Sequence, residues 1–406
     1  MFVHQGTIKA AQMINQSSPI IRQQWTLPVP VEYGPGARSA LSALCLFHGM
    51  RAPVIVTDAG TASLPFTLEL LEQLNQSGLR AALYAEIEVN PTDRSVTQGA
   101  AFYRDWKADG VVALGGGSGL DAGKAIALIA AQSRAGLWDF DFDRPVVQGF
   151  RAADFPPVIC VPTTAGTGAE TESTAMITDT GRRIKGCVWH PLARPAAVIL
   201  DPELTLGLPA HLTAWTGMDA LIHALEAWFV PSFNPLCDGA ALQALELMWD
   251  ALPIAVADGS DLQARSRMLA GSCLAGIAFN KGLGLVHALS HMVGAACNTH
   301  HGLTNAIILP VVLEFNRCVI ESRLAPVCHA MGLPSDDFDL FYHAICTRLD
   351  ALDIPKSLSA IGVPREALVD IATKALLDPA RGTNPRDSDL PQLQQLLCKA
   401  IDQARN

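Results

Sequence analysis

Charged residues are scarce in this sequence of 406 residues, and basic residues are the scarcer kind. Only 17% of the residues are charged, with 29 Lys and Arg against 39 Asp and Glu, which gives a formal net charge of −10 at pH 7. A protein that binds nucleic acid needs a basic surface to neutralise phosphates. The composition therefore argues against a nucleic-acid partner, while 50% hydrophobic residues are typical of a globular protein with a large core.

Long apolar runs and paired cysteines are also missing. No uninterrupted apolar run of about 18 residues occurs, so the sequence predicts neither a transmembrane helix nor a membrane partner. The ten cysteines are scattered singly from Cys45 to Cys398, and no two form a CxxC pair. This pattern argues against a disulfide framework or a cysteine zinc site, and it favours reduced thiols in a cytoplasmic protein.

The first 24 residues lack the apolar core of a secretory signal. They also contain no acidic residue, which is typical of transit peptides; the first acidic residue of the chain is Glu32. Only Lys9 and Arg22 are basic in this stretch. Two interpretations stay open, a transit segment and a structural extension.

Short β-branched runs alternate with helical patterns in the first half of the chain. Strands are expected at "APVIVTDAG" (52–60), "LRAALYAEI" (79–87), "PVICVP" (157–162) and "AAVILDPEL" (196–204). Such alternation implies a parallel sheet covered by helices. Beyond about residue 206, apolar residues recur every three or four positions, which predicts helices. We therefore expect an α/β domain over 1–205 and an all-α domain over 206–406.

A glycine-rich turn joins a strand to a helix in "VVALGGGSGLDAGKAIAL" (111–128). Glycines allow close backbone approach, and the free N–H groups of a helix N-terminus suit a pyrophosphate. The turn is not a P-loop, which would need glycine in place of Ser118 and serine or threonine in place of Ala125. It is not a GxGxxG fingerprint either, because Leu120 stands where the last glycine is required. The alternative is a plain tight turn.

A second polar loop, "PTTAGTG" (162–168), also follows a strand. Ligands bind beyond the carboxyl ends of parallel strands, so the two loops could meet on one molecule. Asp58 ends another strand, where a carboxylate could accept a hydrogen bond from a ribose 2′-hydroxyl and repel a 2′-phosphate. That would favour NAD over NADP, although Asp58 could also be an ordinary turn residue.

Histidines cluster in "GLVHALSHMVGAACNTHHG" (284–302), which holds four of the chain's eleven. Asp219 and His223 are four residues apart and share one helical face, as do His287 and His291. A carboxylate with imidazoles suits Fe²⁺, Zn²⁺ or Mn²⁺. Spacing alone does not select the ligands among His287, His291, His300 and His301. The isolated histidines are expected to be core or surface residues: His190, His211, His329 and His343.

In order along the chain, nine motifs resemble the iron-containing (group III) alcohol dehydrogenase family. They are "EYGPGA", "VNPT", "GGGSGLDAGKAIAL", "PTTAGTGAE", "DPELT", "GMDALIHALEA", "GLGLVHALSH", "HGLTNAIILP" and "TNPR". The resemblance covers nearly the whole chain. It implies a Rossmann-like NAD-binding domain followed by a helical metal-binding and catalytic domain, and a homodimer or higher homo-oligomer.

The resemblance also assigns the site residues. It implies metal ligands at Asp219, His223, His287 and His301, and a histidine beside the nicotinamide and substrate at His291. The implied NAD contacts are Asp58, Asn90, Gly116, Gly117, Ser118, Asp121, Thr163, Thr164, Thr167, Thr174 and Lys185. The sequence departs from the family pattern at "AETESTAMITD", which includes Ala169, and at "AFNKGLGLVH", which is one residue short in a segment that lines the substrate pocket of relatives.

These features predict an NAD-dependent oxidoreductase acting on an alcohol or aldehyde, with Fe²⁺, or alternatively Zn²⁺ or Mn²⁺, as Lewis acid and His291 as proton relay. One alternative is a lyase resembling dehydroquinate synthase. Another is a specialised reductase of the maleylacetate or hydroxy-acid type, of which the metal-independent maleylacetate type is disfavoured by the four ligand residues. A metallohydrolase without NAD and a non-enzymatic binding protein are weaker alternatives. The sequence leaves the substrate open among short alcohols, diols and hydroxy acids.

Overall fold

The computed structural model describes residues 29–402 and 405, so the predicted transit segment or extension lies outside the described residues. Eight strands are described: β1 (Val31–Tyr33), β2 (Pro53–Asp58), β3 (Ala82–Ile87), β4 (Gly110–Gly115), β5 (Val158–Pro162), β6 (Thr174–Asp179), β7 (Ile184–Trp189) and β8 (Ala197–Leu200). Six of them form a fully parallel sheet in the order β1-β8-β5-β4-β2-β3. The predicted parallel α/β domain is confirmed.

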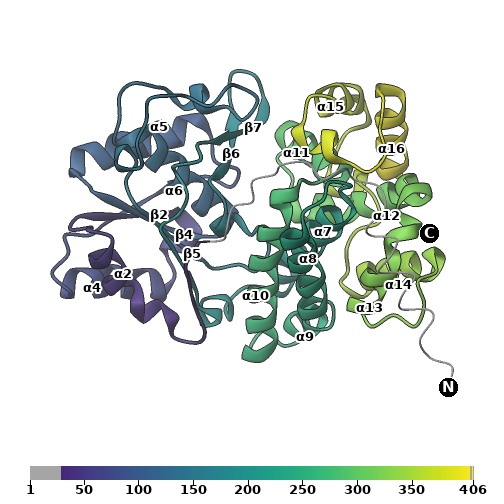
Figure 1. Cartoon of the computed structure of the whole chain (residues 1–406), viewed down its shortest axis with the longest axis horizontal. Helices are drawn as coiled ribbons and strands as arrows, with labels where there is room; N and C mark the ends of the chain where they lie inside the picture. Colours follow the sequence, from purple (N-terminus) through teal and green to yellow (C-terminus); the bar gives the residue numbers. More distant parts are fainter. Residues whose placement is uncertain (1–28, 403–404, 406) are drawn as a thin grey trace.

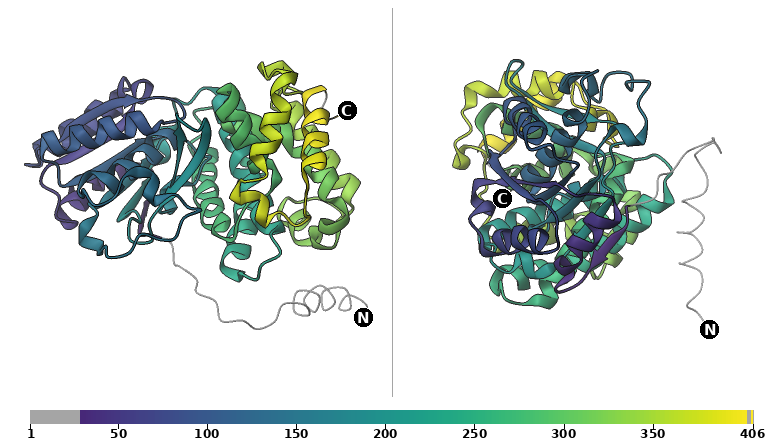
Figure 2. Two further views of the ribbon diagram at one scale, coloured as in Figure 1. Left: turned by 90° about the horizontal axis from the view of Figure 1, so that it is seen from above. Right: turned by 90° about the vertical axis from the view of Figure 1, so that its left-hand side faces the viewer.

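Helices cover both faces of this sheet because successive strand residues point to opposite sides. In β2, Val54 and Val56 belong to one buried cluster while Ile55 belongs to the other. The first cluster packs with α5 (Asp93–Trp106) and α6 (Gly117–Ala130), and the second with α2 (Leu41–Phe47) and α4 (Pro65–Gln76). A short helix, α3 (Ala59–Ala62), follows β2 directly. Figures 1 and 2 show the resulting three layers.

The second half of the chain is helical, as predicted. Its helices are α7 (Ala210–Phe229), α8 (Pro235–Met248), α9 (Ala251–Ala257), α10 (Leu262–Ala278), α11 (Leu285–Cys297), α12 (His301–Ile320), α13 (Leu324–Ala330), α14 (Phe338–Ala351), α15 (Leu368–Ala375) and α16 (Leu390–Asp402). In the described part of the chain no strand follows β8. Helix α7 is central, since α8, α9, α10 and α12 all pack against it.

A β-hairpin of β6 and β7 lies between the two halves and was not predicted. The two strands pair antiparallel over their whole length, from Thr174 opposite Trp189 to Asp179 opposite Ile184. The hairpin packs against α6 on one side and, through β7, against α11 on the other. Figure 1 shows it where the sheet half meets the helical half. Residues of this hairpin therefore face both halves of the molecule.

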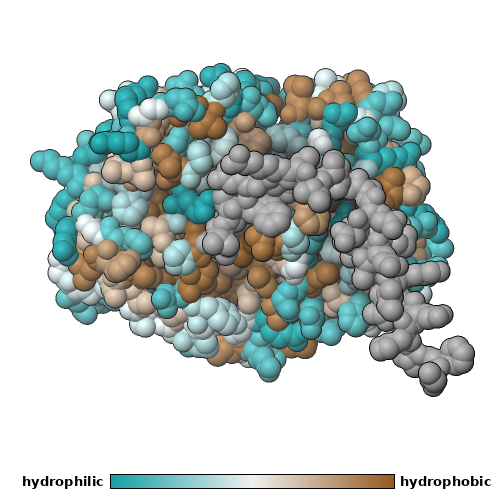
Figure 3. Space-filling view, in the orientation of Figure 1, coloured by the Kyte–Doolittle hydropathy of each residue, from teal (hydrophilic) through white to brown (hydrophobic). Residues whose placement is uncertain are grey.

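Among the described residues, one continuous helical stretch is long and apolar enough to cross a membrane by length and composition alone, and two bent helix pairs pass the same test only if each pair is taken as one span. The continuous stretch runs through residues 301–330, and 72% of its most apolar window is buried inside the protein. Packing of α12 against α7, α11, α14 and α16 accounts for this apolar composition. On the face drawn in Figure 3, hydrophilic residues alternate with smaller hydrophobic areas.

Candidate active site and metal centre

A single cleft contains every residue that the sequence assigned to the site. It is lined from the sheet half by the loops that follow β2, β4 and β5, and from the helical half by α7, α11 and the start of α12. The predicted residues that line it are Asp58, Asn90, Gly116, Gly117, Ser118, Asp121, Thr163, Thr164, Thr167, Thr174, Lys185, Asp219, His223, His287, His291 and His301. The strand order brings the three loops together, since β4 lies between β2 and β5.

The glycine turn touches the second polar loop, "PTTAGTG" (162–168), which we call the threonine loop. Gly115 ends β4 with φ 134°, a conformation that favours glycine, and α6 begins at Gly117. The carbonyl of Gly115 accepts a hydrogen bond from the N–H of Thr163 at 2.9 Å. A Cβ at Gly117 would lie 2.7 Å from the Thr167 side chain. The two loops therefore form one surface at the N-terminus of α6.

Asp58 and Asn90 have local partners as well as positions in the cleft. The Asp58 carboxylate accepts hydrogen bonds from the N–H of Thr61 at 2.9 Å and from its hydroxyl at 2.7 Å, so it also caps α3. Asn90 has φ 61°, and its side-chain amide donates to Oδ1 of Asn298 at 2.9 Å. Asn298 follows α11 directly. The second contact joins the sheet half to the helical half.

The remaining predicted cofactor residues lie around the β6–β7 hairpin. Asp121 pairs with Lys124 at 3.1 Å and accepts a hydrogen bond from the N–H of Met176 at 3.2 Å, so it holds α6 to β6. Lys185 on β7 has its Nζ atom 3.5 Å from Oδ1 of Asn90. Burial lowers the pKa of Lys185, although nearby carboxylates oppose this. The amine of Lys185 is therefore part of the cleft wall.

Four of the predicted residues form a compact donor set. Asp219 and His223 come from α7, His287 from α11 and His301 from the first position of α12. One ligand atom from each lies within 4.8 Å of the other three. Oδ1 of Asp219 is 4.0, 3.7 and 3.6 Å from the Nε2 atoms of His223, His287 and His301, respectively. A carboxylate and three imidazoles at this spacing fit a divalent metal ion.

The electrostatics of the set also fit a cation. Burial alone would raise the pKa of Asp219, but the imidazoles of His223 and His301 hold it well below its usual range. Burial lowers the pKa of His223 to about 4 and holds that of His301 well below the usual imidazole value. Burial opposes a charge on His287 too, but hydrogen bonds to Asp219 and Glu226 raise its pKa to about 9. The set thus offers an ionised carboxylate and two neutral imidazoles, whereas His287 must give up its Nε2 proton to bind a metal.

In each of the three histidines Nε2 faces Asp219, and the other ring nitrogen, Nδ1, has a polar partner that holds the ring in place. Nδ1 of His223 donates to the carbonyl of Gly166 at 3.2 Å, and Nδ1 of His287 donates to Glu226 at 2.5 Å. Nδ1 of His301 lies 3.1 Å from the hydroxyl of Ser290. Such contacts fix the tautomer and turn Nε2 toward the metal position. The Gly166 contact also connects the threonine loop to the donor set.

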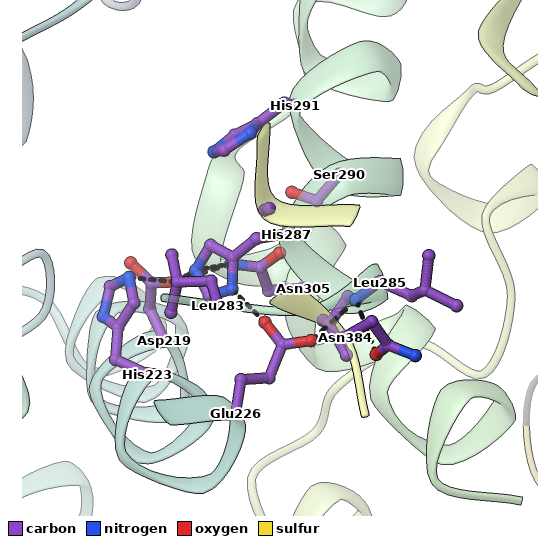
Figure 4. A network of polar contacts seen from close by, with 12 residues as sticks. Asp219, His223, Glu226, Leu283, Leu285, His287, Ser290, His291, Asn305 and Asn384 are labelled. Carbon is purple, nitrogen blue, oxygen red and sulfur yellow. Dashed lines mark hydrogen bonds and ion pairs between the residues drawn. The ribbon is translucent and has the colours of Figure 1, made fainter. Parts of the chain in front are cut away.

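Sequence reasoning missed three side chains that contact the donor set, those of Glu226, Ser290 and Asn305. Glu226 lies on α7 and contacts His287 across to α11, as Figure 4 shows. The amide nitrogen of Asn305 is 2.6 Å from Oδ1 of Asp219, and 3.1 Å from Nε2 of His287. Spacing gave a signal, because Glu226 lies two helical turns beyond Asp219 and Asn305 lies one turn beyond His301.

His291 lies in the cleft outside the donor set, with its ring stacked 5.3 Å from that of His301. Its Nδ1 donates to Oδ2 of Asp378 at 2.8 Å, and Asp378 was also missed from the sequence. The other oxygen of Asp378 accepts a hydrogen bond from the N–H of Ala380 at 2.9 Å. His300 caps α12 by accepting a hydrogen bond from the N–H of Leu303 at 3.4 Å, so it neighbours the set without joining it.

Family models match both halves of the chain. Residues 28–202 match the iron-containing alcohol dehydrogenase model, and residues 213–401 match the C-terminal model of the Fe-containing alcohol dehydrogenase family. Both matches favour the dehydrogenase over the predicted alternative of a lyase.

Individual relatives agree with the family models. The 4-hydroxybutyrate dehydrogenase of Cupriavidus necator is 38% identical over 89% of this chain and 95% of its own length. The NAD-dependent methanol dehydrogenase of Bacillus methanolicus is 34% identical over 92% of this chain and 99% of its own. The crystal structure of a 1,3-propanediol oxidoreductase superposes with a TM-score of 0.87 and 34% identity, covering 94% of this chain and 100% of that one. The chain belongs to the iron-containing alcohol dehydrogenase family.

Proposed function

We propose that this protein is an NAD-dependent, divalent-metal alcohol dehydrogenase that also reduces aldehydes. The observation that carries the proposal is the set of buried Asp219, His223 and His287 with half-buried His301, in the same cleft as the glycine turn and the threonine loop. A nucleotide site and a metal site that face one cleft suit hydride transfer between an alcohol and nicotinamide.

The proposed NAD site follows the loops at the carboxyl edge of the sheet. The N–H groups of Gly116, Gly117 and Ser118 at the start of α6 would bind the pyrophosphate. Asp58 would accept a hydrogen bond from a ribose hydroxyl. The other proposed contacts are Asn90, Asp121, Thr163, Thr164, Thr167, Thr174 and Lys185. We take the domain division at residues 205 and 206, which places the cofactor loops in the first domain.

The proposed metal ligands are Asp219, His223, His287 and His301, and the proposed ion is Fe²⁺, with Zn²⁺ or Mn²⁺ accepted by the same donors. When bound, the ion supplies a Lewis acid that lowers the pKa of the alcohol and polarises the aldehyde. Glu226 and the other Nδ1 partners orient the imidazoles.

His291 is the proposed proton relay. Its Nδ1 donates to Asp378, which leaves Nε2 as the atom that takes a proton from the alcohol side and releases it toward solvent. In the direction of aldehyde reduction the same atom returns the proton. Asp378 acts as a positioning residue because it fixes the ring without touching the reactants.

The proposed setting is a cytoplasmic homodimer or higher homo-oligomer that acts on small alcohols or aldehydes. The cytoplasmic location is supported by the ten cysteines, all of which lie in the described residues and are free. A second candidate function is a hydroxy-acid dehydrogenase on the same fold, which the similarity to a 4-hydroxybutyrate dehydrogenase favours.

The test is metal-dependent formation of NADH, followed by its absorbance. Metal-stripped protein is given NAD and a panel of alcohols, then Fe²⁺ without oxygen, Zn²⁺ or Mn²⁺. We expect activity only after metal is added. His223→Ala and His301→Ala should abolish metal binding and turnover while NAD binding remains, and His343→Ala on the exposed face of α14 serves as the control. Normal turnover in either cleft variant would contradict the metal assignment.

A further inference from the structure

Glu172 is a cleft residue that the proposed mechanism does not use. It lies between the short 3₁₀ helix η4 (Ala169–Thr171) and β6, in the stretch "AETESTAMITD" that departs from the family pattern. It lines the cleft together with Met176 and Cys187 of the hairpin. Phe279 lines the same cleft, and its ring lies 5.0 Å from that of His223. The cleft that contains Glu172 therefore also includes apolar side chains, of which Phe279 lies beside the donor set.

The carboxylate of Glu172 is incompletely satisfied by the protein. One oxygen, Oε2, accepts a hydrogen bond from the hydroxyl of Thr174 at 3.2 Å. The other, Oε1, is buried and has no hydrogen-bond partner among the described residues. A buried acceptor without a donor is unfavourable. A ligand that donates a hydrogen bond at this position therefore gains more binding free energy than it would from the same bond to an acceptor in water. The terminal torsion of a glutamate turns easily, so either oxygen can face the cleft.

Glu172 is an acidic group in a cleft that is also lined by four basic residues, Lys124, Lys185, Arg194 and Lys281. Burial raises the pKa of Glu172 to about 7, although Lys124 and Arg194 lower it. Lys124 is itself paired with Asp121 at 3.1 Å. A further cation of the cleft, Lys281, is paired with Asp238 at 2.5 Å. An anionic substrate group placed at Glu172 would therefore meet a like charge, whereas a hydroxyl would meet an acceptor.

We propose that Glu172 determines substrate specificity by accepting a hydrogen bond from a substrate hydroxyl remote from the reacting carbon, so that the cleft favours diols over hydroxy acids. The inference rests on the proposed alcohol dehydrogenase function. It selects between two substrate classes named for relatives, the diol of a 1,3-propanediol oxidoreductase and the hydroxy acid of a 4-hydroxybutyrate dehydrogenase. A simple alcohol of the same chain length lacks the donor, and a hydroxy acid carries the disfavoured charge.

The experiment compares kcat/KM for 1,3-propanediol, propan-1-ol and 4-hydroxybutyrate with metal-loaded protein and NAD. The pH is set about two units above the pKa of Glu172, so that the carboxylate is ionised. We expect kcat/KM for the diol to exceed that for propan-1-ol by about tenfold or more, because a hydrogen bond to a charged acceptor would stabilise the bound diol. In Glu172→Leu this preference should vanish. In Glu172→Gln, which keeps an acceptor without the charge, the diol preference should remain and 4-hydroxybutyrate should gain about tenfold.

The controls separate this inference from the function on which it rests. Glu246→Gln, an exposed acid on α8, should leave all three ratios unchanged. If the parent oxidises alcohols but shows no preference for the diol, or if both Glu172 variants keep the parental ratios, the specificity role is wrong. If Glu172→Leu fails to fold, the gain on 4-hydroxybutyrate in Glu172→Gln decides. If no alcohol gives NADH although NAD and metal bind, the proposed function itself fails, and the inference with it.

Discussion

Glu226 on α7 accepts a hydrogen bond from Nδ1 of His287 on α11 at 2.5 Å. The other oxygen of the same carboxylate accepts a hydrogen bond from the backbone N–H of Val286 at 2.8 Å. The neighbouring N–H, that of Leu285, donates to Oδ1 of Asn384 at 3.1 Å (Figure 4). Glu226 therefore satisfies the N-terminus of α11 and fixes the ring of His287, whose Nε2 lies 3.7 Å from Asp219.

Replacing Glu226 should weaken metal binding before it weakens the fold. In Glu226→Gln the side chain keeps its length and can still accept from Val286, but it loses the charge that holds the Nδ1 proton. We expect the metal dissociation constant to rise by about 10- to 100-fold. Competition with a coloured chelator, using Zn²⁺ and Co²⁺, measures this directly. Glu69→Gln on the exposed face of α4 is the control, and an unchanged affinity in Glu226→Gln would refute the orienting role.

Asn305 should also contribute to the metal centre, since its side-chain nitrogen lies 2.6 Å from Oδ1 of Asp219. It lies 3.1 Å from Nε2 of both His287 and His301 as well. If the amide positions Asp219 by donating to it, Asn305→Asp and Asn305→Leu should both weaken metal binding by about tenfold or more. Tighter metal binding by Asn305→Asp would instead mean that the new carboxylate at this position acts as a metal ligand. The same chelator competition distinguishes the two outcomes.

The sheet was predictable because hydrophobic runs of the right length stand between helical patterns. The hairpin was missed although its sequence carries a local signal. Buried and partly buried residues alternate along β6 and β7, and the four-residue connection between the strands contains Gly181. What the sequence does not show is the position of the hairpin between α6 and α11, because that depends on contacts with distant segments.

The donor residues were identifiable in the sequence, whereas helical spacing placed Glu226 and Asn305 on the same helix faces as donor residues without showing which side chains they contact. Asp219 and His223 share a helical face, which local spacing reveals. The choice of His287 and His301 over other clustered histidines came from the resemblance to a family. The contacts that orient them join distant segments, as His287 and Glu226 are 61 residues apart and His291 and Asp378 are 87 apart. No local pattern reports such a contact.

Gly119 should be required for the packing of α6 against β4. A Cβ at this position would lie 2.4 Å from the carbonyl oxygen of Leu114, which is backbone and cannot turn away. We expect Gly119→Ala to lower the free energy of unfolding by about 1–3 kcal/mol. Gly239 on α8 has open space where a Cβ would lie, with nothing within 4 Å, so Gly239→Ala should raise stability by up to about 1 kcal/mol. Chemical denaturation of both variants checks the opposite signs.

Glu170 should make the protein less stable as the pH rises through neutrality. Its side chain is 2% exposed, and burial raises the pKa of its carboxyl from 4.5 to about 7. Below the unfolded value both states hold the proton, whereas above the folded value the native state must bury a charge. The shift corresponds to about 3 kcal/mol of stability that is present at low pH and lost between these two values.

In Glu170→Gln the side chain is neutral at every pH, so the variant should lack the part of the stability loss with rising pH that Glu170 causes. The midpoint of thermal unfolding, measured near the unfolded pKa and again above about 7, should therefore fall less in the variant than in the parent. Glu69→Gln, whose carboxyl is exposed, should follow the parent at both pH values. Parallel decline in Glu170→Gln and the parent would mean that Glu170 is ionised at little cost, and that its burial is compensated by Lys124, which lowers its pKa.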